Sequence, residues 1–447
     1  MMKMVKYKRT LLLLIRGLNV GVMTALVAYV WYVYYADIIP TPLFRKGNYL
    51  VIFIYFSLIT AYTQLNGGYK IGDNRISESI YSNIISLIFV NSVFFFFISL
   101  MGRQWLDALP YIIICVIQII YIIIWSVLAN KIYFKIFEPR RIIYIYEGKQ
   151  PGHILQKMYQ RYDKYDVQKV VNVAQIENYL VLIEPFDAVV LDRMSGGLKE
   201  EYIKLAYRIN KRVYLVPDYD DVLIENSMAI NLLDSPLYLM KNRGLSFEQQ
   251  FIKRILDLII CIPMLIILFP VFVVVAIMIK CEDGGPIFYK QSRLTLHGKE
   301  FQIYKFRSMI PDAEKVNGVQ FMSNDDPRVT KIGRVTRKLR IDELPQLINI
   351  IKGEMSIVGP RPERPEVFDK LCEEFPEFRY RLTGKAGLTG YAQVMGKYNT
   401  ALEDKLVFDL MYLENYSVVF DLKIILMTFK TIFDFHATEG VKEEEND

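Results

Sequence analysis

The sequence predicts a membrane-anchored α/β protein of several domains, and three observations lead to this fold class. Four apolar stretches lie near the N-terminus, alternating strand-like and helix-like segments follow them, and a fifth long apolar run precedes a charged C-terminal region. A chain of 447 residues has room for two or three domains. Because 53% of its residues are hydrophobic and 14% are aromatic, it is more apolar than an ordinary soluble enzyme, and we expect a lipid bilayer as a partner.

The four N-terminal stretches are each about long enough to cross the ~30 Å of hydrocarbon in a bilayer. They are Gly17–Tyr35, Tyr49–Leu65, Ile80–Leu100 and Pro110–Leu128. The first stretch ends in aromatic residues such as Trp31 and Tyr35, where a cleaved signal peptide needs small ones. We therefore predict a retained first span with an aromatic belt, and four transmembrane helices within residues 1–130.

Positive charge sets the predicted orientation of these spans. Basic residues gather before the first span, in the loop after the second and behind the fourth: Lys3, Lys6, Lys8, Arg9, Arg16, Lys70, Arg75, Lys131, Lys135, Arg140 and Arg141. The opposite loops hold only Arg45, Lys46 and Arg103. By the positive-inside rule, the N-terminus and everything after residue 131 face the cytoplasm.

Residues 131–245 alternate between strand-like and helix-like segments. Short buried strands are expected at Arg141–Tyr146, Asp187–Asp192 and Val213–Val216, with a helix at Lys199–Asn210. This alternation predicts a parallel, Rossmann-like sheet. The turn after the first strand, EGKQPG, lacks the G-x-G-x-x-G phosphate fingerprint. A regulatory or dimer-forming role, in a homodimer, is therefore favoured over nucleotide binding.

The fifth apolar run, Ile255–Ile279, is long enough to cross a bilayer. Basic residues stand at both of its ends and two prolines stand inside it: Lys253, Arg254, Lys280, Pro263 and Pro270. A spanning helix would carry the following region away from cytosolic nucleotides. Cations at both ends and helix-breaking prolines favour a bent, re-entrant helix that enters and leaves on the cytoplasmic face.

Two strand-like segments, Pro286–Gln291 and Phe301–Arg307, flank the turn-like Leu296–Lys299 and predict a hairpin. Lys305 and Arg307 project from one face of its second strand, either as edge charges or to reach a diphosphate. Farther on, a Gly-rich loop, KAGLTGYAQ, has no function fixed by its composition. Residues 402–433 predict amphipathic helices that rest on the membrane or pack on the core. Residues 436–447 end in VKEEEND and predict a disordered acidic tail.

The stretch 331–362 is the predicted site of chemistry. Its first part is a cationic, helix-like surface that suits phosphate: Lys331, Arg334, Arg337, Lys338 and Arg340. Asp342 and Glu343 follow, and Pro345 fits the first turn of a new helix, whose N-terminus stabilises a phosphoryl group. Cations, a nucleophile and Mg²⁺ held by carboxylate are the parts that phosphoryl transfer needs. Taken alone, however, an Asp-Glu pair is typical of an ordinary helix start.

Other residue types point away from competing classes of site. The cysteines show no metal or redox spacing, and the histidines are isolated: Cys115, Cys261, Cys281, Cys372, His153, His297 and His436. The net charge of +6 has its excess near the membrane segments and the Asp-Glu pair. It indicates lipid and phosphate as partners and no nucleic acid.

Several motifs within residues 246–435 occur together in a characteristic order. They are FIKRILDLI, GPIFYKQSR, FQIYKFRSM, LRIDELPQLINIIKGEMSIVGPRP and GLTGYAQVMG. They resemble the bacterial sugar transferases in their large monotopic phosphoglycosyl transferase form, the polyprenyl-phosphate hexose-1-phosphate transferases. The resemblance implies a re-entrant-helix catalytic domain on the cytoplasmic face of the bacterial inner membrane. It also implies transfer of a sugar 1-phosphate from a UDP-sugar to undecaprenyl phosphate, with UMP released, at the start of exopolysaccharide or capsule synthesis.

The resemblance also assigns roles to single residues. Asp342 would be the nucleophile that forms a phospho-aspartate, and Glu343 would share in handling Mg²⁺ or a proton. Arg337 and Arg361 would contact phosphates.

Three prolines have structural roles in this resemblance. Pro360 and Pro362 would shape the turn that carries Arg361, and Pro270 would break the re-entrant helix. Phe269 departs from the family pattern, because many relatives have a small polar residue before this proline.

Two other functions use similar residues. A metal-dependent membrane phosphatase would send the phosphoryl group to water, whereas a scaffold for polysaccharide assembly would perform no chemistry. A requirement for undecaprenyl phosphate with release of UMP separates the transferase from the phosphatase. A scaffold predicts that the Asp342→Asn variant keeps its function.

Overall fold

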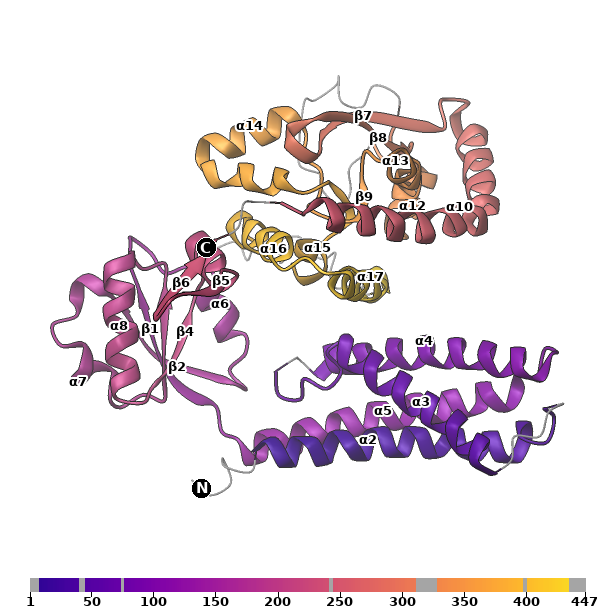
Figure 1. The fold of residues 1–447 in the computed structure, drawn as a ribbon, viewed down its shortest axis with the longest axis horizontal. Coiled ribbons are helices and arrows are strands. Elements are labelled where there is room, and N and C mark those ends of the chain that lie inside the picture. Colours follow the sequence, from indigo (N-terminus) through magenta and orange to yellow (C-terminus); the bar gives the residue numbers. More distant parts are fainter. Residues whose placement is uncertain are drawn as a thin grey trace. The chain divides into compact units, whose positions relative to one another are not determined.

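The computed structural model describes residues 8–39, 45–73, 76–240, 244–310, 328–396 and 400–433. The chain forms two compact units, Met1–Val216 and Pro217–Asp447 (Figure 1). The first unit contains the N-terminal helices and an α/β module, and the second contains the charged stretch with Asp342 and Glu343. The predicted acidic tail lies outside the described residues.

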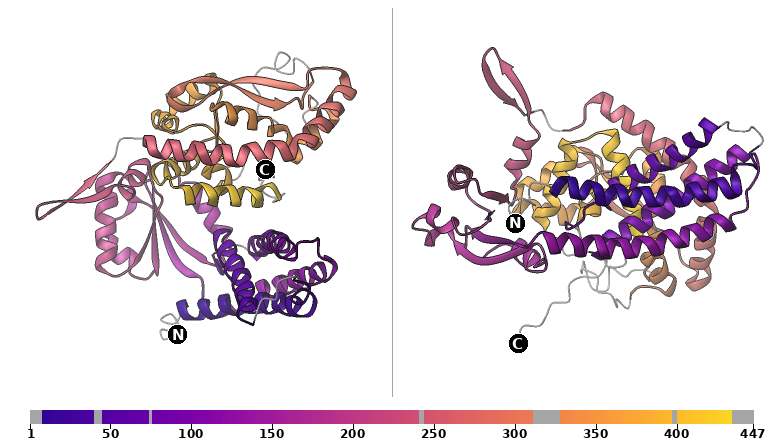
Figure 2. Two further views of the ribbon diagram at one scale, coloured as in Figure 1. Left: turned by 45° about the vertical axis from the view of Figure 1, so that its right-hand side comes forward. Right: turned by 90° about the horizontal axis from the view of Figure 1, so that it is seen from below.

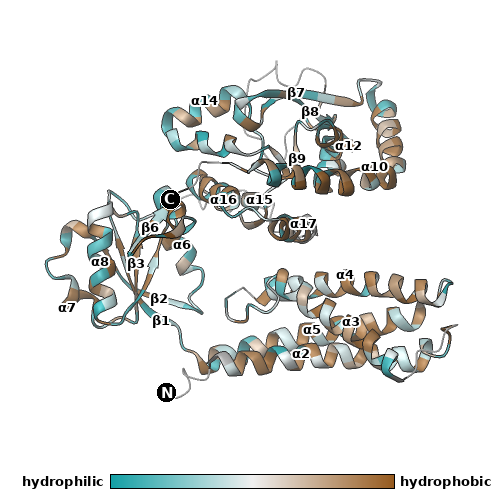
Figure 3. Ribbon diagram, viewed as in Figure 1, coloured by the Kyte–Doolittle hydropathy of each residue, from teal (hydrophilic) through white to brown (hydrophobic). Residues whose placement is uncertain are grey.

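All four N-terminal apolar stretches are helical, as predicted. They form α2 (Lys8–Val30) with a π-helical extension η1 (Trp31–Tyr35), α3 (Arg45–Leu65), α4 (Ile76–Gly102) and α5 (Leu109–Ile136). With α10 of the second unit, the described residues contain five helices long and apolar enough to cross a membrane, by length and composition. Hydrophobic residues along these helices colour much of the ribbon brown in Figure 3. Buried polar side chains join three of them: the Tyr55 hydroxyl donates to Asn91 (3.0 Å), which donates to Gln118 (2.9 Å).

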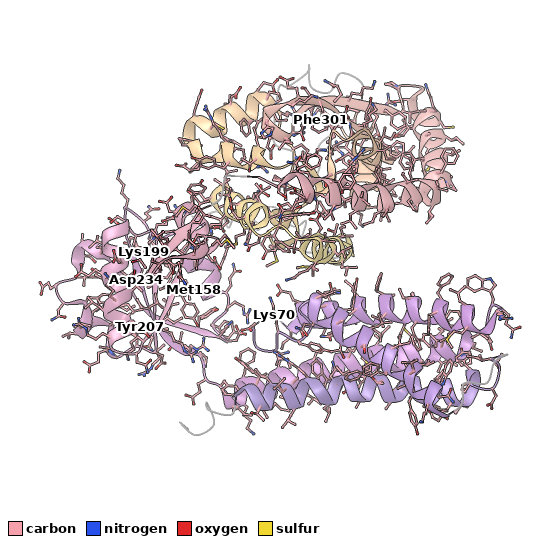
Figure 4. The ribbon with its side chains drawn as sticks, viewed as in Figure 1. Lys70, Met158, Lys199, Tyr207, Asp234 and Phe301 are labelled. Carbon is pink, nitrogen blue, oxygen red and sulfur yellow. The ribbon has the colours of Figure 1, made fainter. Side chains whose placement is uncertain are left out.

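The loop between α3 and α4 contacts the α/β module of the same unit. Asp73 accepts an ion pair from Lys164 (2.6 Å), and Arg161 donates to the carbonyl of Gly72 (3.4 Å). Lys70, labelled in Figure 4, belongs to the same loop. Because this loop and the module touch, they lie on one side of the helices, in agreement with the orientation that the positive charges predict.

The α/β module is built on a four-stranded parallel sheet of order β2-β1-β3-β4. Its strands are β1 (Arg140–Tyr146), β2 (Tyr165–Asn172), β3 (Ala188–Asp192) and β4 (Arg212–Leu215). Its helices are α6 (Ile154–Tyr159), η2 (Val173–Gln175), α7 (Tyr179–Ile183) and α8 (Gly196–Arg208). The three predicted strands and the predicted helix are confirmed. Strand β2 was not predicted; it is an edge strand of mixed polar and apolar residues, YDVQKVVN.

Both faces of this sheet are covered, because successive side chains of a strand point to opposite sides. Ile143 and Ile145 pack against α7 and α8. Ile142 and Tyr144 pack against α6, together with Met158, which Figure 4 labels. The covered faces explain why the strands read as near-continuous apolar runs.

Two carboxylates line the carboxyl edge of the sheet. Asp192 accepts hydrogen bonds from the Tyr144 hydroxyl (2.6 Å) and the Gly152 amide (2.8 Å). Glu147 accepts from the Ser195 amide, immediately before α8. Ligand phosphates bind at this edge in sheets of this class, so the two negative charges make the edge unfavourable for a nucleotide.

The second unit begins with α9 (Tyr219–Glu225) and an exposed hairpin, β5 (Met228–Leu232) with β6 (Ser235–Leu239). Figure 2 shows this hairpin projecting from its unit. This hairpin was not predicted from the sequence. Its two-residue loop contains Leu233 in the left-handed region (φ 56°) instead of the glycine or asparagine that normally marks such turns.

Helix α10 (Phe247–Asp283) is a single element of 37 residues that bends sharply (Figures 1 and 2). Its first half packs on the main core through residues up to Leu268. Its second half packs on a separate cluster from Val271 onward. The change of packing partner falls at Pro270, where the ring removes a helical hydrogen bond and crowds the preceding turn.

Both ends of α10 contact the same globular body. Near its start, Arg254 donates to the carbonyl of Ile351 (2.6 Å) at the end of α13 (Gln346–Lys352). At its end, Glu282 accepts from the Lys331 amide (2.8 Å) at the start of α12 (Lys331–Lys338). A straight helix of this length would extend for roughly 55 Å, so the bend is what returns its second end to this body.

The remaining elements form a compact α+β body around this helix. The predicted hairpin is confirmed as β7 (Phe288–Leu294), η3 (Leu296–Gly298) and β8 (Glu300–Phe306). A parallel pair, β9 (Ser356–Val358) and β10 (Gly387–Thr389), follows. The other helices are α14 (Pro365–Glu374), η5 (Pro376–Thr383), α15 (Tyr391–Met395), α16 (Leu402–Glu414) and α17 (Val418–Phe433). The predicted amphipathic C-terminal helices bury Leu406, Leu410 and Ile424 in the core.

Candidate active site

Asp342 and Glu343 lie on a short turn between two helices. The basic run forms α12, whose N-terminus is capped by the Thr330 hydroxyl accepting from the Gly333 amide (2.9 Å). Arg340 then adopts a left-handed conformation (φ 54°), which ends the helix and starts the 3₁₀ turn η4 (Ile341–Glu343). Pro345 directly precedes α13, as predicted. The acidic pair is thus held between the end of a cationic helix and the start of another.

Glu343 is the centre of an ion-pair network drawn from three distant segments. Its Oε1 accepts from Lys305 (2.9 Å) and Arg361 (3.0 Å). Lys305 lies near the end of β8, and Arg361 lies on the turn after β9. The Glu343 side chain is 17% exposed, so these pairs are partly shielded from solvent. The structure therefore brings together two of the predicted phosphate-binding cations.

Asp342 differs from its neighbour, because no hydrogen bond reaches its carboxylate from the described residues. Burial, and then the charge of Glu343, raise the pKa of Asp342 to about 6, although the charges of Lys305, Arg337 and Arg361 oppose this rise. Burial also opposes ionisation of Glu343, but Arg361 and Lys305 outweigh it and lower the pKa of that carboxyl. The two adjacent carboxylates thus differ: Glu343 is ionised and bound by two cations, whereas Asp342 accepts no hydrogen bond from the described residues.

We expect the Asp342 carboxyl of the metal-free protein to titrate near pH 6. Its pKa is raised, so below this pH the carboxyl holds a proton and is a poor nucleophile, and above it the carboxylate is available. Glu343, with its lowered pKa, should remain ionised throughout. Carboxyl ¹³C NMR of aspartate-labelled protein measures the midpoint, and Asp342→Asn assigns the signal. A midpoint near the ordinary aspartate value of 3.8 would contradict this expectation.

The turn that carries Arg361 is fixed by close backbone contacts. The Gly359 amide donates to the Thr389 carbonyl (2.9 Å), and the Gly387 amide donates to the Pro360 carbonyl (2.9 Å). A Cβ on Gly387 would lie 2.1 Å from the Gly359 nitrogen, and one on Gly390 would lie 2.2 Å from the Gly359 oxygen. The Gly-rich loop, whose role the sequence did not reveal, therefore positions Arg361 through its lack of side chains.

The other predicted residues lie around this centre in different arrangements. Arg307 is buried and forms an ion pair with Asp283, at the end of α10, so it does not share the Glu343 network of Lys305. The Arg337 Nε donates to the Ser308 hydroxyl (2.7 Å). Pro362 borders the turn and accepts from Arg293 through its carbonyl (3.0 Å). Arg307 thus directs its charge at Asp283 and not at the acidic pair.

The carboxylates fit a magnesium site that substrate completes. Within the described ranges no group of three or more His, Cys, Asp and Glu residues could hold a metal by itself. Mg²⁺, however, is commonly bound by one or two carboxylates together with water and substrate phosphates. The unpaired carboxylate of Asp342, beside Glu343, supplies such oxygen ligands. These residues are therefore compatible with Mg²⁺ bound jointly with a diphosphate.

Comparison with known proteins agrees with this site. A family profile described as bacterial sugar transferase matches residues 248–435. The exopolysaccharide production protein ExoY of Sinorhizobium fredii is 41% identical over 197 residues, which cover 40% of this chain and 83% of ExoY. The chain belongs to the bacterial sugar transferase family. All of the site residues, from Lys305 to Pro362, lie within the matched region.

Longer members of this family match more of the chain. The UDP-N-acetylgalactosamine-undecaprenyl-phosphate N-acetylgalactosaminephosphotransferase of Aeromonas hydrophila is 35% identical over 262 residues, 55% of this chain and 59% of that protein. The UDP-glucose:undecaprenyl-phosphate glucose-1-phosphate transferase of Escherichia coli is 32% identical over 259 residues, 54% of this chain and 55% of its own length. The chain thus spans a little over half the length of these two sugar transferases, whose names give different sugars.

Proposed function

We propose that this protein transfers a sugar 1-phosphate from a UDP-sugar to undecaprenyl phosphate, releases UMP, and so starts the synthesis of a bacterial surface polysaccharide. The observation that carries the proposal is the unpaired carboxylate of Asp342 beside a Glu343 held by Lys305 and Arg361. A carboxylate nucleophile and cations placed for a diphosphate are what phosphoryl transfer requires. The names of the Aeromonas and E. coli relatives supply the lipid acceptor and the nucleotide-sugar donor.

The chemistry proceeds in two displacements at one phosphorus atom. In the first, an oxygen of Asp342 attacks the sugar-linked phosphorus of the UDP-sugar, and the bond to the bridging oxygen breaks as UMP leaves. In the second, a phosphate oxygen of undecaprenyl phosphate attacks the same phosphorus and releases Asp342. Both reactants are anions, so Lys305, Arg337 and Arg361 stabilise charge in each step. Division into two steps lets the nucleotide leave before the anionic lipid arrives.

Asp342 and Glu343 would hold Mg²⁺ in this proposal. The ion would neutralise negative charge on the diphosphate when bound. Arg361, whose pKa is raised by the charge of Glu343, remains a cation at the edge of the acidic pair.

The site is proposed to face the cytoplasm of the inner membrane, with α10 re-entrant. Contacts at Arg254 and at Glu282 connect both ends of α10 to one body, which supports this topology. We expect single cysteines at Gln250 and Gly284, in a background without native cysteines, to be shielded from an impermeant thiol reagent in intact cells and labelled after lysis. Labelling of only the second position in intact cells would indicate a spanning helix instead.

Purified protein assayed against a panel of UDP-sugars, with UMP release as the readout, tests the proposed reaction. We expect one or a few sugars to support UMP release and a lipid product to appear when undecaprenyl phosphate and Mg²⁺ are present. Release of inorganic phosphate to water without a lipid requirement would favour a phosphatase. Polysaccharide synthesis that survives Asp342→Asn would favour a scaffold.

A further inference from the structure

Asp257 is a buried carboxylate within the apolar helix α10. It is 3% exposed and accepts from the Ser356 hydroxyl (3.0 Å) and the Ile357 amide (3.0 Å) of β9. A buried carboxylate is costly unless such hydrogen bonds satisfy it. Residues Gly359 to Pro362 follow β9 directly and carry Arg361, the partner of Glu343. The first half of α10 is thus bound four residues before an active-site cation.

Glu282 makes the corresponding contact at the other end of α10. Its carboxylate accepts from the amides of Lys331 (2.8 Å) and Ile332 (3.4 Å), where an acidic side chain caps α12 and complements its dipole. Helix α12 carries Arg337 and leads through Arg340 to Asp342. The second half of α10 is thus bound to the element that presents the nucleophile.

These two contacts lie on opposite sides of the bend at Pro270. The first holds the segment with Arg361, and the second holds the segment with Arg337 and Asp342. Because the bend fixes the relation between the two halves of α10, it also fixes the relation between these two segments. Catalytic groups that must meet one phosphorus atom tolerate little misplacement.

We propose that Asp257 and Glu282 are positioning residues, through which the bent membrane helix sets the placement of Arg361 relative to Asp342. The inference rests on the proposed function, because the positions of Arg361 and Asp342 matter only if the site transfers a phosphoryl group. Neither residue touches the reacting atoms in this account. Asp257 acts through the backbone of β9, and Glu282 acts through the start of α12.

The test compares Asp257→Ala with Asp257→Asn, and Glu282→Ala with Glu282→Gln, in full-length protein in lipid nanodiscs. The alanine variants are expected to lower kcat for UMP release by about 10-fold or more, with the KM for the UDP-sugar within about 3-fold. The amide variants keep an oxygen acceptor and should recover most of kcat. Hydrogen exchange should accelerate at residues 356–362 in Asp257→Ala and at residues 331–336 in Glu282→Ala.

Phe378→Leu is the matched control for a loss of stability alone. Phe378 is buried in the same body, where it packs against Phe368 and lies under Arg381. This variant should lower the melting temperature, but hydrogen exchange at residues 356–362 should not become faster than in the wild-type protein. If Asp257→Ala and Asp257→Asn behave alike, or if exchange at 356–362 does not change, the positioning role is wrong.

The two proposals fail in different ways. If wild-type protein releases UMP from none of the UDP-sugars, the proposed function fails, and the exchange measurements still decide whether Asp257 and Glu282 hold their segments. If wild-type protein is active and both alanine variants retain its kcat, the function stands and the positioning role is overturned. Should Asp257→Ala not fold, the comparison of Glu282→Ala with Glu282→Gln decides the case, because faster exchange at residues 331–336 and a lower kcat are expected in the alanine variant alone.

Discussion

Asp342→Asn is expected to lower the rate of UMP release by about 10⁴-fold or more, the largest effect of any single substitution in the chain. The amide has nearly the same shape as the carboxylate but no negative charge with which to attack phosphorus. Folding should survive, because burial opposes ionisation of this side chain, as its raised pKa shows. Wild-type protein given UDP-sugar labelled in the sugar, without lipid, should release about one UMP per active site and retain the label on the Asp342 peptide.

The same labelling experiment can also contradict the role of Asp342 as the nucleophile. If UMP appears only when undecaprenyl phosphate is added, and rapid quenching traps no labelled peptide, the lipid phosphate attacks directly. Asp342 would then serve only as a metal ligand. Thermal unfolding of wild type and Asp342→Asn, measured in the same nanodiscs, separates loss of chemistry from loss of the fold.

Arg361→Ala is expected to lower kcat/KM for UMP release by about 10²-fold to 10³-fold. The substitution removes a cation from the site of charge development and leaves Glu343 with Lys305 as its remaining partner in the described network. Arg361→Lys should recover part of the loss, since lysine restores the charge but not the planar fork that binds phosphate at two points. Initial rates across UDP-sugar concentrations measure the effect.

Arg379→Ala is the control for Arg361→Ala. Arg379 is an exposed arginine on η5 in the same body. Its removal should change kcat/KM by less than about 2-fold, because it is exposed and is not among the charges that shift the pKa of Asp342 or Glu343. Equal losses in both variants would mean that total positive charge, and not the placement of Arg361, supports the reaction.

Local features of the chain were predictable from the sequence. Hydropathy located the apolar helices, and β-branched runs located three strands of the parallel sheet. The basic helix before Asp342 and the start of a new helix after Pro345 also follow from local rules, since spacing, capping and proline placement act within a few residues.

Contacts between distant segments were not predictable in the same way. Lys305 and Arg307 read as equivalent cations two residues apart, but Arg307 lies past the end of β8 and pairs with Asp283. Asp257 is a lone acidic residue in an apolar run of the sequence, and its partners on β9 are 99 and 100 residues away. The glycines around Gly387 could not be interpreted without the backbone that they approach. Composition identifies such residues, but only the fold identifies their partners.

The buried ion pair at the start of α10 has a consequence for how the protein is made. Lys253 donates to Asp421 (2.7 Å), a residue 168 positions later in the chain. At about 5–20 residues per second, a ribosome needs roughly 10 to 30 seconds to synthesise that interval. During this time the apolar helix has left the ribosome while its start still lacks its acidic partner. In the proposed re-entrant topology, the start and end of α10 have to stay on one side of the bilayer before the tertiary contacts exist, so the charges and prolines of α10 itself would direct its insertion.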